Sequence, residues 1–340
     1  MKLGSETRIS MSMGTQDPKT RVVLRSVSER SIPSVVQECM ELCEWESWVP
    51  RDSTIVLKPN LCTIVPEQME KSNTDTALTA AVCEVLLSRT KRIYIGEADH
   101  LRRTAQQGFE VTGHAELARK LGIQVVNFSE VPRVKVACEP IGEIEMPRLL
   151  IEADAFITLP VLKTHALTYF TGSLKNQWGC VPQHNRILLH QLIDPLLASL
   201  QQMLQPKLSI MDAIVGMEGR GPVNGEPRRL DLILAGRDAV AVDATAMRLV
   251  GLDPQHTKHL VMAGEQGFGR IKAEEIEIDG NWQQHATQFK PAKMDWAIAS
   301  MLYMSQYPWF VKYVLEQNYV FYPVRSFVQF LRRLGIVGNG

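Results

Sequence analysis

The sequence predicts an α/β fold in which a mostly parallel sheet carries helices on both faces and is followed by a C-terminal aromatic-rich helical appendage. Three observations predict it. Apolar runs alternate with amphipathic segments, as in proteins built from β-α units. The apolar runs are continuous, which is typical of strands buried on both faces. The chain has 340 residues, enough for one large domain or two medium ones.

The expected strands are short apolar runs rich in β-branched residues. In 53–60, "STIVLKPN", the run ends in Pro-Asn, and in 153–163, "ADAFITLPVLK", it continues to a lysine. The same pattern predicts strands at 21–27, 53–60, 92–99, 123–128, 153–163, 207–216 and 230–236.

The expected helices combine apolar residues at helical spacing with capping residues. Segment 31–45 begins at Ser31 and carries Val35, Val36 and Cys39 at helical spacing. The same signals predict helices at 31–45, 74–90, 114–122, 190–204 and 239–251.

Composition divides the chain into three parts. Residues 1–20 are polar, without the apolar core of a signal peptide, and are expected to be disordered. Residues 21–285 form the predicted α/β domain, and 286–340 the helical extension. No run of eighteen apolar residues exists, so no membrane-spanning helix is expected. The formal net charge of zero does not favour a nucleic-acid partner.

Six cysteines occur without a C-x-x-C pair, which favours reduced thiols and a cytoplasmic location. The wide spacing also predicts no iron–sulfur cluster bound by this chain. The sequence identifies no other cofactor.

The extension contains eleven aromatic residues between Trp296 and Phe330. One interpretation is a helical segment that packs on the body or on a second subunit. The alternatives are an interfacial helix that makes peripheral membrane contact, and a lid over an apolar substrate.

Polar side chains follow several of the predicted strands. In parallel sheets, ligands bind past the carboxyl ends of the strands, so these groups are expected to form an anion-binding site. The expected catalytic residues are Lys163, His165 and Lys175, with His165 as the proton-transfer group. The expected substrate-binding residues of this set are Lys58, Asn60, Thr171 and Asn176. The alternative is that the lysines are solvated and that His165 caps a turn.

A glycine-rich loop follows the strand at 207–216. It is neither a Walker loop nor a dinucleotide-binding fingerprint, and a plain turn is the alternative to a site. We expect its glycines to let the backbone approach a ligand and its two charged residues to contact substrate. The substrate-binding residues predicted here are Glu218, Gly219, Arg220, Gly221 and Gly225.

Three aspartates are expected to support the site. Asp238 is predicted to cap a helix, and Asp243, inside that helix, is expected to pair with a lysine of the site. Asp212 ends a strand. Oxygen ligands from Asp99, Asp212 and Glu218 suit Mg²⁺, but the sequence does not show that they converge, and the metal is left open.

Five segments occur in the order that characterises a large bacterial and archaeal family. They are "STIVLKPNL", "ITLPVLKTHALTYFTGSLKNQWGCVP", "HQLIDPLLASL", "LSIMDAIVGMEGRGPVNGEP" and "LILAGRDAVAVDATAMRLVGLDP". Over about residues 20 to 270 the chain resembles domain-of-unknown-function family 362. The positions matching the family's motifs are Lys58, Pro59, Asn60, Lys163, His165, Thr171, Lys175, Asn176, Gly179, His190, Asp212, Gly219, Gly221, Pro222, Gly225, Asp238 and Asp243.

Many members of that family carry a ferredoxin-like cluster module, so the resemblance implies redox chemistry in some of them. This chain lacks the cysteine cluster, and electron transfer would require a redox partner protein. The side chains themselves favour proton transfer next to a carboxylate or carbonyl. The expectation is an enzyme, an oxidoreductase or a proton-transfer enzyme, that acts on an anionic small molecule. The alternatives are a non-catalytic anion- or partner-binding protein and a peripheral membrane enzyme with an apolar substrate.

Overall fold

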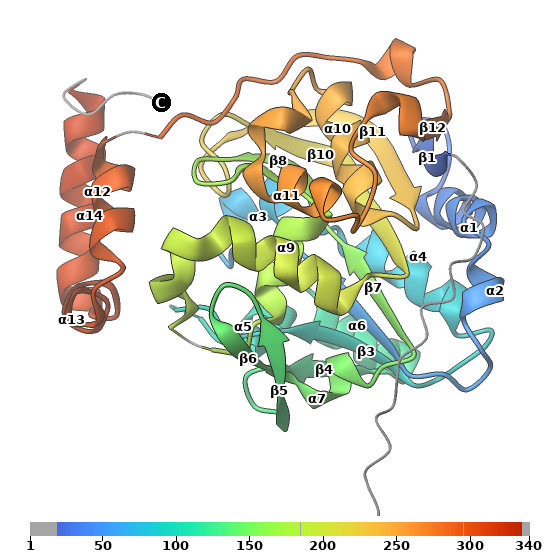
Figure 1. The fold of residues 1–340 in the computed structure, drawn as a ribbon, viewed down its shortest axis with the longest axis horizontal. Helices are drawn as coiled ribbons and strands as arrows, with labels where there is room; N and C mark the ends of the chain where they lie inside the picture. The colour runs from blue at the N-terminus through green and yellow to red at the C-terminus, as the bar shows by residue number, and fades with distance from the viewer. Residues whose placement is uncertain (1–18, 102, 184, 295, 335–340) are drawn as a thin grey trace, which may run out of the picture.

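The computed structural model describes residues 19–101, 103–183, 185–294 and 296–334. Most of the predicted N-terminal segment, residues 1–18, lies outside these ranges. Within them the chain forms a ten-stranded sheet and a separate two-stranded sheet (Figure 1). The strands are β1 (Thr20–Ser26), β2 (Ile55–Pro59), β3 (Ile93–Glu97), β4 (Gln124–Asn127), β5 (Arg133–Cys138), β6 (Gly142–Pro147), β7 (Ala155–Leu159), β8 (Val161–His165), β9 (Tyr169–Thr171), β10 (Leu208–Glu218), β11 (Glu226–Gly236) and β12 (Ile276–Asp279).

Helices connect and cover these strands. They are α1 (Ile32–Leu42), α2 (Trp45–Trp48), α3 (Pro66–Ser72), α4 (Thr76–Leu86), α5 (Ala105–Val111), α6 (His114–Leu121), α7 (Arg148–Ile151), α8 (Ser173–Asn176), α9 (Ile193–Leu204), α10 (Ala239–Leu249), α11 (Lys258–Glu265), α12 (Trp296–Met304), α13 (Pro308–Phe310) and α14 (Asn318–Arg333). Short 3-10 turns include Gln177–Cys180 and Arg186–Leu192, and Val311–Leu315 forms a π-helical turn.

The main path of the large sheet runs β12-β1-β11-β10-β7-β2-β3-β4. Strands β2, β3, β4, β7 and β10 are mutually parallel, and β11 returns antiparallel to β10. From β2 the chain adds β3 and β4 on one side and β7 and β10 on the other. The order therefore reverses between β2 and β7, and at such a switch point the connections diverge and leave a crevice at the carboxyl edge.

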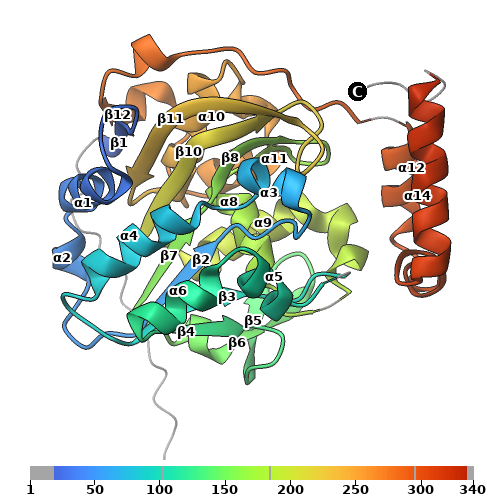
Figure 2. The ribbon, with the colours of Figure 1, turned by 180° about the vertical axis from the view of Figure 1, so that it is seen from behind.

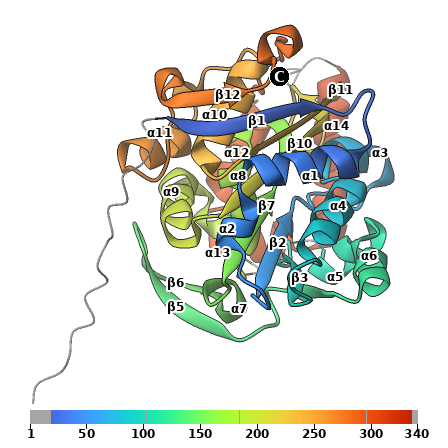
Figure 3. The ribbon, with the colours of Figure 1, turned by 90° about the vertical axis from the view of Figure 1, so that its right-hand side faces the viewer.

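Helices cover both faces of the sheet, as Figure 3 shows with the sheet nearly edge-on. Helices α1, α4 and α6 pack on the face that buries Ile55 and Leu57 of β2, whereas α9 packs on the face that buries Val56. Helices α10 and α11 cover the sheet near β1, β10 and β11. The alternating residues of β2 thus bury on opposite faces, and the predicted α/β class with a mostly parallel sheet is confirmed.

One predicted strand is wrong in its extent. The segment 153–163 was expected to be continuous, but Pro160 divides it into β7 and β8. Proline has no N–H to donate to the ladder. Its carbonyl still accepts from Asp212 N at 2.8 Å, and beyond it β8 pairs with β10 instead of continuing β7 beside β2. The resulting offset carries Lys163 and His165 past the carboxyl edge of the sheet.

The predicted C-terminal helices are present. Helices α12 and α14 lie side by side beyond the carboxyl edge of the sheet, with the turn at α13 at one end of the pair (Figures 1 and 2). We call residues 296–334 the C-terminal hairpin. A hydrogen bond from Gln191 Nε2 to the carbonyl of Leu302 in α12, 3.0 Å, joins it to the body. Within the described ranges, no helix has the length and apolar content to cross a bilayer.

Candidate anion-binding site

A cavity of about 820 Å³ lies at the switch point, between the carboxyl edge of the sheet and the C-terminal hairpin. Its volume is within the range of small-molecule sites, about 300 to 1,000 Å³. It brings together most of the residues predicted from the sequence: Lys58, Asn60, Lys163, His165, Thr171, Lys175, Asn176, Arg220 and Gly221.

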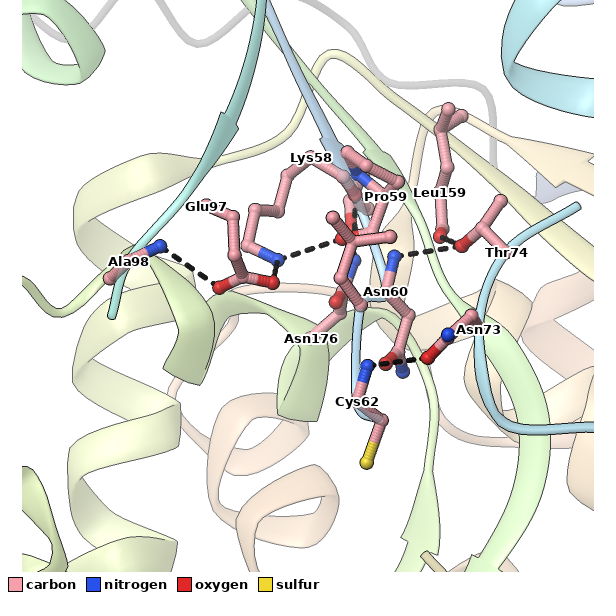
Figure 4. Close-up of polar contacts among 12 residues, drawn as sticks. Lys58, Pro59, Asn60, Cys62, Asn73, Thr74, Glu97, Ala98, Leu159 and Asn176 are labelled. Atoms are coloured by element: carbon pink, nitrogen blue, oxygen red, sulfur yellow. Dashed lines mark hydrogen bonds and ion pairs between the residues drawn. The ribbon is translucent and has the colours of Figure 1, made fainter. Parts of the chain in front are cut away.

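Lys58 and Glu97 form a buried ion pair at the ends of the adjacent parallel strands β2 and β3 (Figure 4). Lys58 Nζ lies 2.8 Å from Glu97 Oε2 and donates to the Pro59 carbonyl at 2.7 Å. Gly179 permits the pair, because a Cβ there would meet Glu97 Oε1 at 2.6 Å and Lys58 Cε at 2.7 Å. Since Glu97 balances its charge, Lys58 is less available to an anion than the sequence suggested.

Hydrogen bonds from backbone N–H groups to side-chain oxygens hold the turn after β2. Asn60 N donates to Thr74 Oγ1 at 2.7 Å, and Cys62 N donates to Asn73 Oδ1 at 2.7 Å (Figure 4). The side chains of Asn60 and Cys62 both line the cavity, and the Cys62 thiol points away from the Lys58–Glu97 pair. This turn therefore presents an amide and a thiol on a fixed backbone.

Lys163 is completely buried on β8, beside Thr171 of β9. Its ammonium donates to the Ser72 carbonyl at 2.7 Å. Burial lowers the pKa of Lys163, and a hydrogen bond with Cys62 opposes that change. The hydroxyl of Thr171 is buried without a hydrogen-bond partner in the described chain, although it lies in the wall of the cavity. A ligand oxygen would satisfy it.

Helix α8 carries Lys175 and begins on a buried carboxylate. Asp243 accepts from Ser173 N at 2.6 Å and from Leu174 N at 3.1 Å. Gly172 allows this approach, because a Cβ there would lie 2.3 Å from Asp243 Oδ1. The expected lysine partner of Asp243 is therefore wrong, since its partners are backbone N–H groups. Burial raises the pKa of Asp243 to about 7, although these hydrogen bonds lower it.

Lys175 is a cation of the cavity wall that has no carboxylate partner among the described residues. Its side chain is partly exposed at the cavity wall, and no hydrogen bond or ion pair of its ammonium is found among the described residues. Burial lowers its pKa to about 8, and the neighbouring Arg186 and Lys163 also lower it, while Cys62 acts in the opposite direction. An amine with such a pKa can bind an anion when charged and accept a proton when neutral.

His165 and His190 line the cavity, and their neutral rings carry the proton on different nitrogen atoms. His165 Nδ1 accepts from Leu167 N at 3.1 Å, so its neutral ring carries the proton on Nε2. His190 Nδ1 donates to the Ile187 carbonyl at 3.0 Å, which leaves Nε2 as the acceptor. Burial, with Lys175 next, lowers the pKa of His165 well below its usual value and that of His190 to about 4. Both rings are therefore neutral at pH 7.

The cavity holds more positive than negative charge. No carboxylate pairs with Lys163, Lys175, Arg103 or Arg186 in the part of the chain that the structure describes. Arg186 is buried and donates to the carbonyls of Asp99 and Val181 at 2.6 and 3.0 Å, and burial lowers its pKa. Buried cations without counter-charges are costly, so an anionic ligand would stabilise this arrangement.

Four predicted substrate-binding residues have other surroundings. Glu218 does not line the cavity: it is buried, lies 3.2 Å from Arg228 Nη1 and accepts from Lys290 N at 3.1 Å. Its prediction as a ligand contact is not supported, because the strand continues to Glu218 and turns this side chain away. Gly219 and Gly225 form the β10–β11 turn outside the cavity wall.

Asn176 lines the cavity, but its amide nitrogen is occupied. Nδ2 donates to the Lys58 carbonyl at 2.8 Å and to Thr158 Oγ1 at 2.9 Å. This side chain therefore ties α8 to the ends of β2 and β7, and only its oxygen is left for a ligand.

The other two aspartates hold backbone groups. Asp238 caps α10 by accepting from Ala241 N at 3.0 Å, which confirms its predicted place at the start of the helix. Asp212 accepts from Asp75 N at 2.8 Å and from Ile214 N at 3.0 Å, and burial raises its pKa to about 6. Over the described ranges, no group of three His, Cys, Asp or Glu side chains is placed to hold a metal ion.

Several ionisable residues of the cavity wall were not among the predicted site residues. Glu97 had a local signal, since it ends a strand, and Cys62 follows Asn60 by two positions. His190 was marked only by its match to the family's motifs, and the others come from turns whose path no sequence pattern indicates. These residues include Cys62, Glu97, His100, Arg103, Arg186 and His190.

Comparison with known proteins identifies relatives. The family model described as "Domain of unknown function (DUF362)" matches residues 55–248. The "Thylakoid-associated protein sll1697" of Synechocystis sp. (strain ATCC 27184 / PCC 6803 / Kazusa) is 27% identical over 253 residues, which are 70% of this chain and 78% of that protein.

Two solved structures share part of the arrangement. A protein from Thermotoga maritima has a TM-score of 0.42 and 13% identity, covering 71% of this chain and 60% of that one. The lactate racemase apoprotein from Thermoanaerobacterium thermosaccharolyticum has a TM-score of 0.42 and 15% identity, covering 66% of this chain and 55% of that one. The chain spans less than two thirds of either structure.

Proposed function

For this chain, which belongs to the family of domain of unknown function 362, we propose an enzyme that binds an anionic small molecule, a carboxylate or a phosphate, and transfers a proton at the carboxyl edge of the sheet. The excess of positive charge in the cavity carries the proposal. Lys175, Lys163 and Arg186 supply charge that no carboxylate of the described residues neutralises. An anionic substrate would neutralise part of this positive charge.

The proton-transfer step follows from the protonation states of the side chains. Lys175, with a pKa of about 8, has a neutral fraction near pH 7 to 8. In that form it acts as the base that removes a proton next to the carbonyl or carboxylate of the substrate, while Lys163 and Arg186 hold the negative charge of the substrate. The electron pair moves onto the substrate oxygen. His165 is neutral and carries its proton on Nε2, so it donates a hydrogen bond and does not act as the base. Redox chemistry with a partner protein is the alternative.

The test begins with thermal unfolding of the full chain in a panel of carboxylates and phosphates. A ligand that binds the folded state raises the unfolding temperature according to RT ln(1 + [L]/Kd). Each hit is then incubated in D₂O with the wild type and with Lys175→Met. Deuterium incorporation in the wild type alone supports proton transfer. Binding without turnover of any hit supports a non-catalytic anion-binding protein, and the absence of hits contradicts both.

Peripheral membrane association is a second candidate function. Large apolar side chains of the C-terminal hairpin are exposed: Trp296, Tyr303, Tyr307, Trp309, Tyr313, Tyr319, Tyr322, Val324, Phe327, Phe330 and Leu334. Aromatic side chains at such a surface suit the headgroup region of a bilayer. The relative's description as thylakoid-associated agrees with this role. Flotation with anionic vesicles tests it: serine at Trp309, Tyr313 and Phe327 should abolish flotation, and unchanged flotation would exclude the hairpin as the anchor.

A further inference from the structure

The wall of the cavity that faces the hairpin differs in chemistry from the wall at the sheet. On the sheet side, the lining side chains are cationic or polar, with Lys163, Lys175 and Thr171 among them. On the hairpin side, the lining residues are Met301, Leu302, Leu315 and Phe321. A ligand that fills the cavity therefore meets charge at one end and apolar side chains at the other.

The hairpin has its own packing and a hydrogen bond to the body. Val311 and Leu315 are 2% and 3% exposed, and Ser305 is completely buried. The carbonyl of Leu302 accepts from Gln191, whose neighbour His190 lines the same cavity. Figures 1 and 2 both place the hairpin beyond the carboxyl edge of the sheet. Lysines and hairpin residues line the same cavity. The apolar wall is thus a defined part of the site.

We propose that the substrate is an amphiphile, with a carboxylate or phosphate head at Lys175 and an apolar chain against the wall of Leu302 and its hairpin neighbours. The inference rests on the proposed function and names its substrate class. A small polar anion would contact only the cations on the sheet side of the cavity. An apolar chain gains free energy by leaving water for the hairpin wall, in proportion to its length. The exposed aromatics on the rest of the hairpin fit a protein that meets its substrate near a lipid surface.

The experiment measures Kd for straight-chain carboxylates and alkyl monophosphates of two to ten carbons, below their micelle concentrations, with the full chain. The wild type should bind each added methylene about fourfold more tightly, the equivalent of about 0.8 kcal/mol. Comparison of the two series identifies the head group. Leu302→Asn should reduce the gain per methylene by more than half and leave the affinity for the shortest anions unchanged. Val111→Asn, at an exposed apolar position of α5 outside the cavity wall, is the control and should keep the full gain.

A second variant, on the body of the protein, tests binding of the apolar chain without altering the hairpin. Ile187 lines the cavity from the body, so Ile187→Asn should reduce the gain per methylene even if Leu302→Asn disturbs the hairpin. If short anions bind and chain length has no effect, the amphiphile is wrong and the proposed anion site stands. If no anion binds at any chain length, the proposed function itself is overturned, and the inference with it.

Discussion

Lys58 and Glu97 meet at the ends of two adjacent parallel strands and form an ion pair whose two side chains are 1% and 4% exposed. The pair lies in the wall of the cavity. The lysines of the site differ in whether they have a carboxylate partner. Lys58 has a carboxylate partner, whereas Lys175 has none among the described residues. The pair thus joins the ends of β2 and β3, and the proposed anion-binding role falls to the other cations.

Glu97→Gln should destabilise the protein by about 3 to 5 kcal/mol, because it leaves the Lys58 ammonium buried without a counter-charge. Denaturant unfolding measures the change. The double variant Lys58→Met, Glu97→Gln should recover most of the loss, because no buried charge is then unpaired. If Glu97→Gln costs less than about 1 kcal/mol, the pair is not the structural element described here.

Gly179→Ala should disturb the Lys58–Glu97 ion pair by a steric clash. The added Cβ would lie 2.6 Å from Glu97 Oε1, so the carboxylate must move away from Lys58. We expect a loss of more than about 2 kcal/mol in the free energy of unfolding. The control is Gly122→Ala, where no atom lies within 4 Å and only the φ of +68° is unfavourable. That control should lose about 1 kcal/mol. Equal losses at both positions would contradict a steric role for Gly179.

Asp243→Ala should weaken anion binding although Asp243 does not line the cavity. It removes the acceptor for Ser173 N and Leu174 N, which costs about 2 to 3 kcal/mol and loosens the helix that carries Lys175. Asp238→Ala is the matched control, because Asp238 caps α10 away from the cavity. Both variants should lose stability, measured by thermal unfolding, but only Asp243→Ala should raise the Kd for the anion. A similar rise in Asp238→Ala would show that the effect is general destabilisation.

Anion affinity should fall as the pH rises through about 8, where Lys175 loses its proton. The unfolded lysine keeps a pKa near 10.5, so the cost of burying the charged form is fully present below pH 8 and disappears towards pH 10.5. Stability without ligand should therefore rise over that interval, while affinity falls. Calorimetric titrations of the anion at pH 6.5 and 9.5 measure the fall in affinity. In Lys175→Arg the affinity should stay constant between these values, since arginine stays protonated.

The sequence identified most of the sheet and about a third of the residues of the cavity wall, for physical reasons. Continuous apolar runs marked β2, β3, β7 and β10, and groups at the ends of parallel strands must meet at one edge. Lys58, Lys163 and Lys175 were found in this way.

What the sequence could not show depends on chain paths after the strands. Pro160 was itself a signal for a break in the strand, but nothing in the local pattern indicated which strand β8 would then pair with, or that Arg186 would return to the cavity. Glu218 was misplaced because the length of β10 decides which way that side chain turns. The expected partner of Asp243 was wrong because backbone N–H groups, which every residue except proline has, leave no mark in the sequence.

The decisive measurement is a calorimetric titration, at pH 7, of the best anion from the thermal screen into the wild type and into Lys175→Met. We expect binding to the wild type and at least a hundredfold loss of affinity, about 2.7 kcal/mol, in the variant. The unliganded variant should be more stable than the wild type by on the order of 1 to 3 kcal/mol, because an unpaired cation has been removed. Equal affinity of the two proteins for the anion would show that Lys175 and its neighbouring cations do not form an anion-binding site.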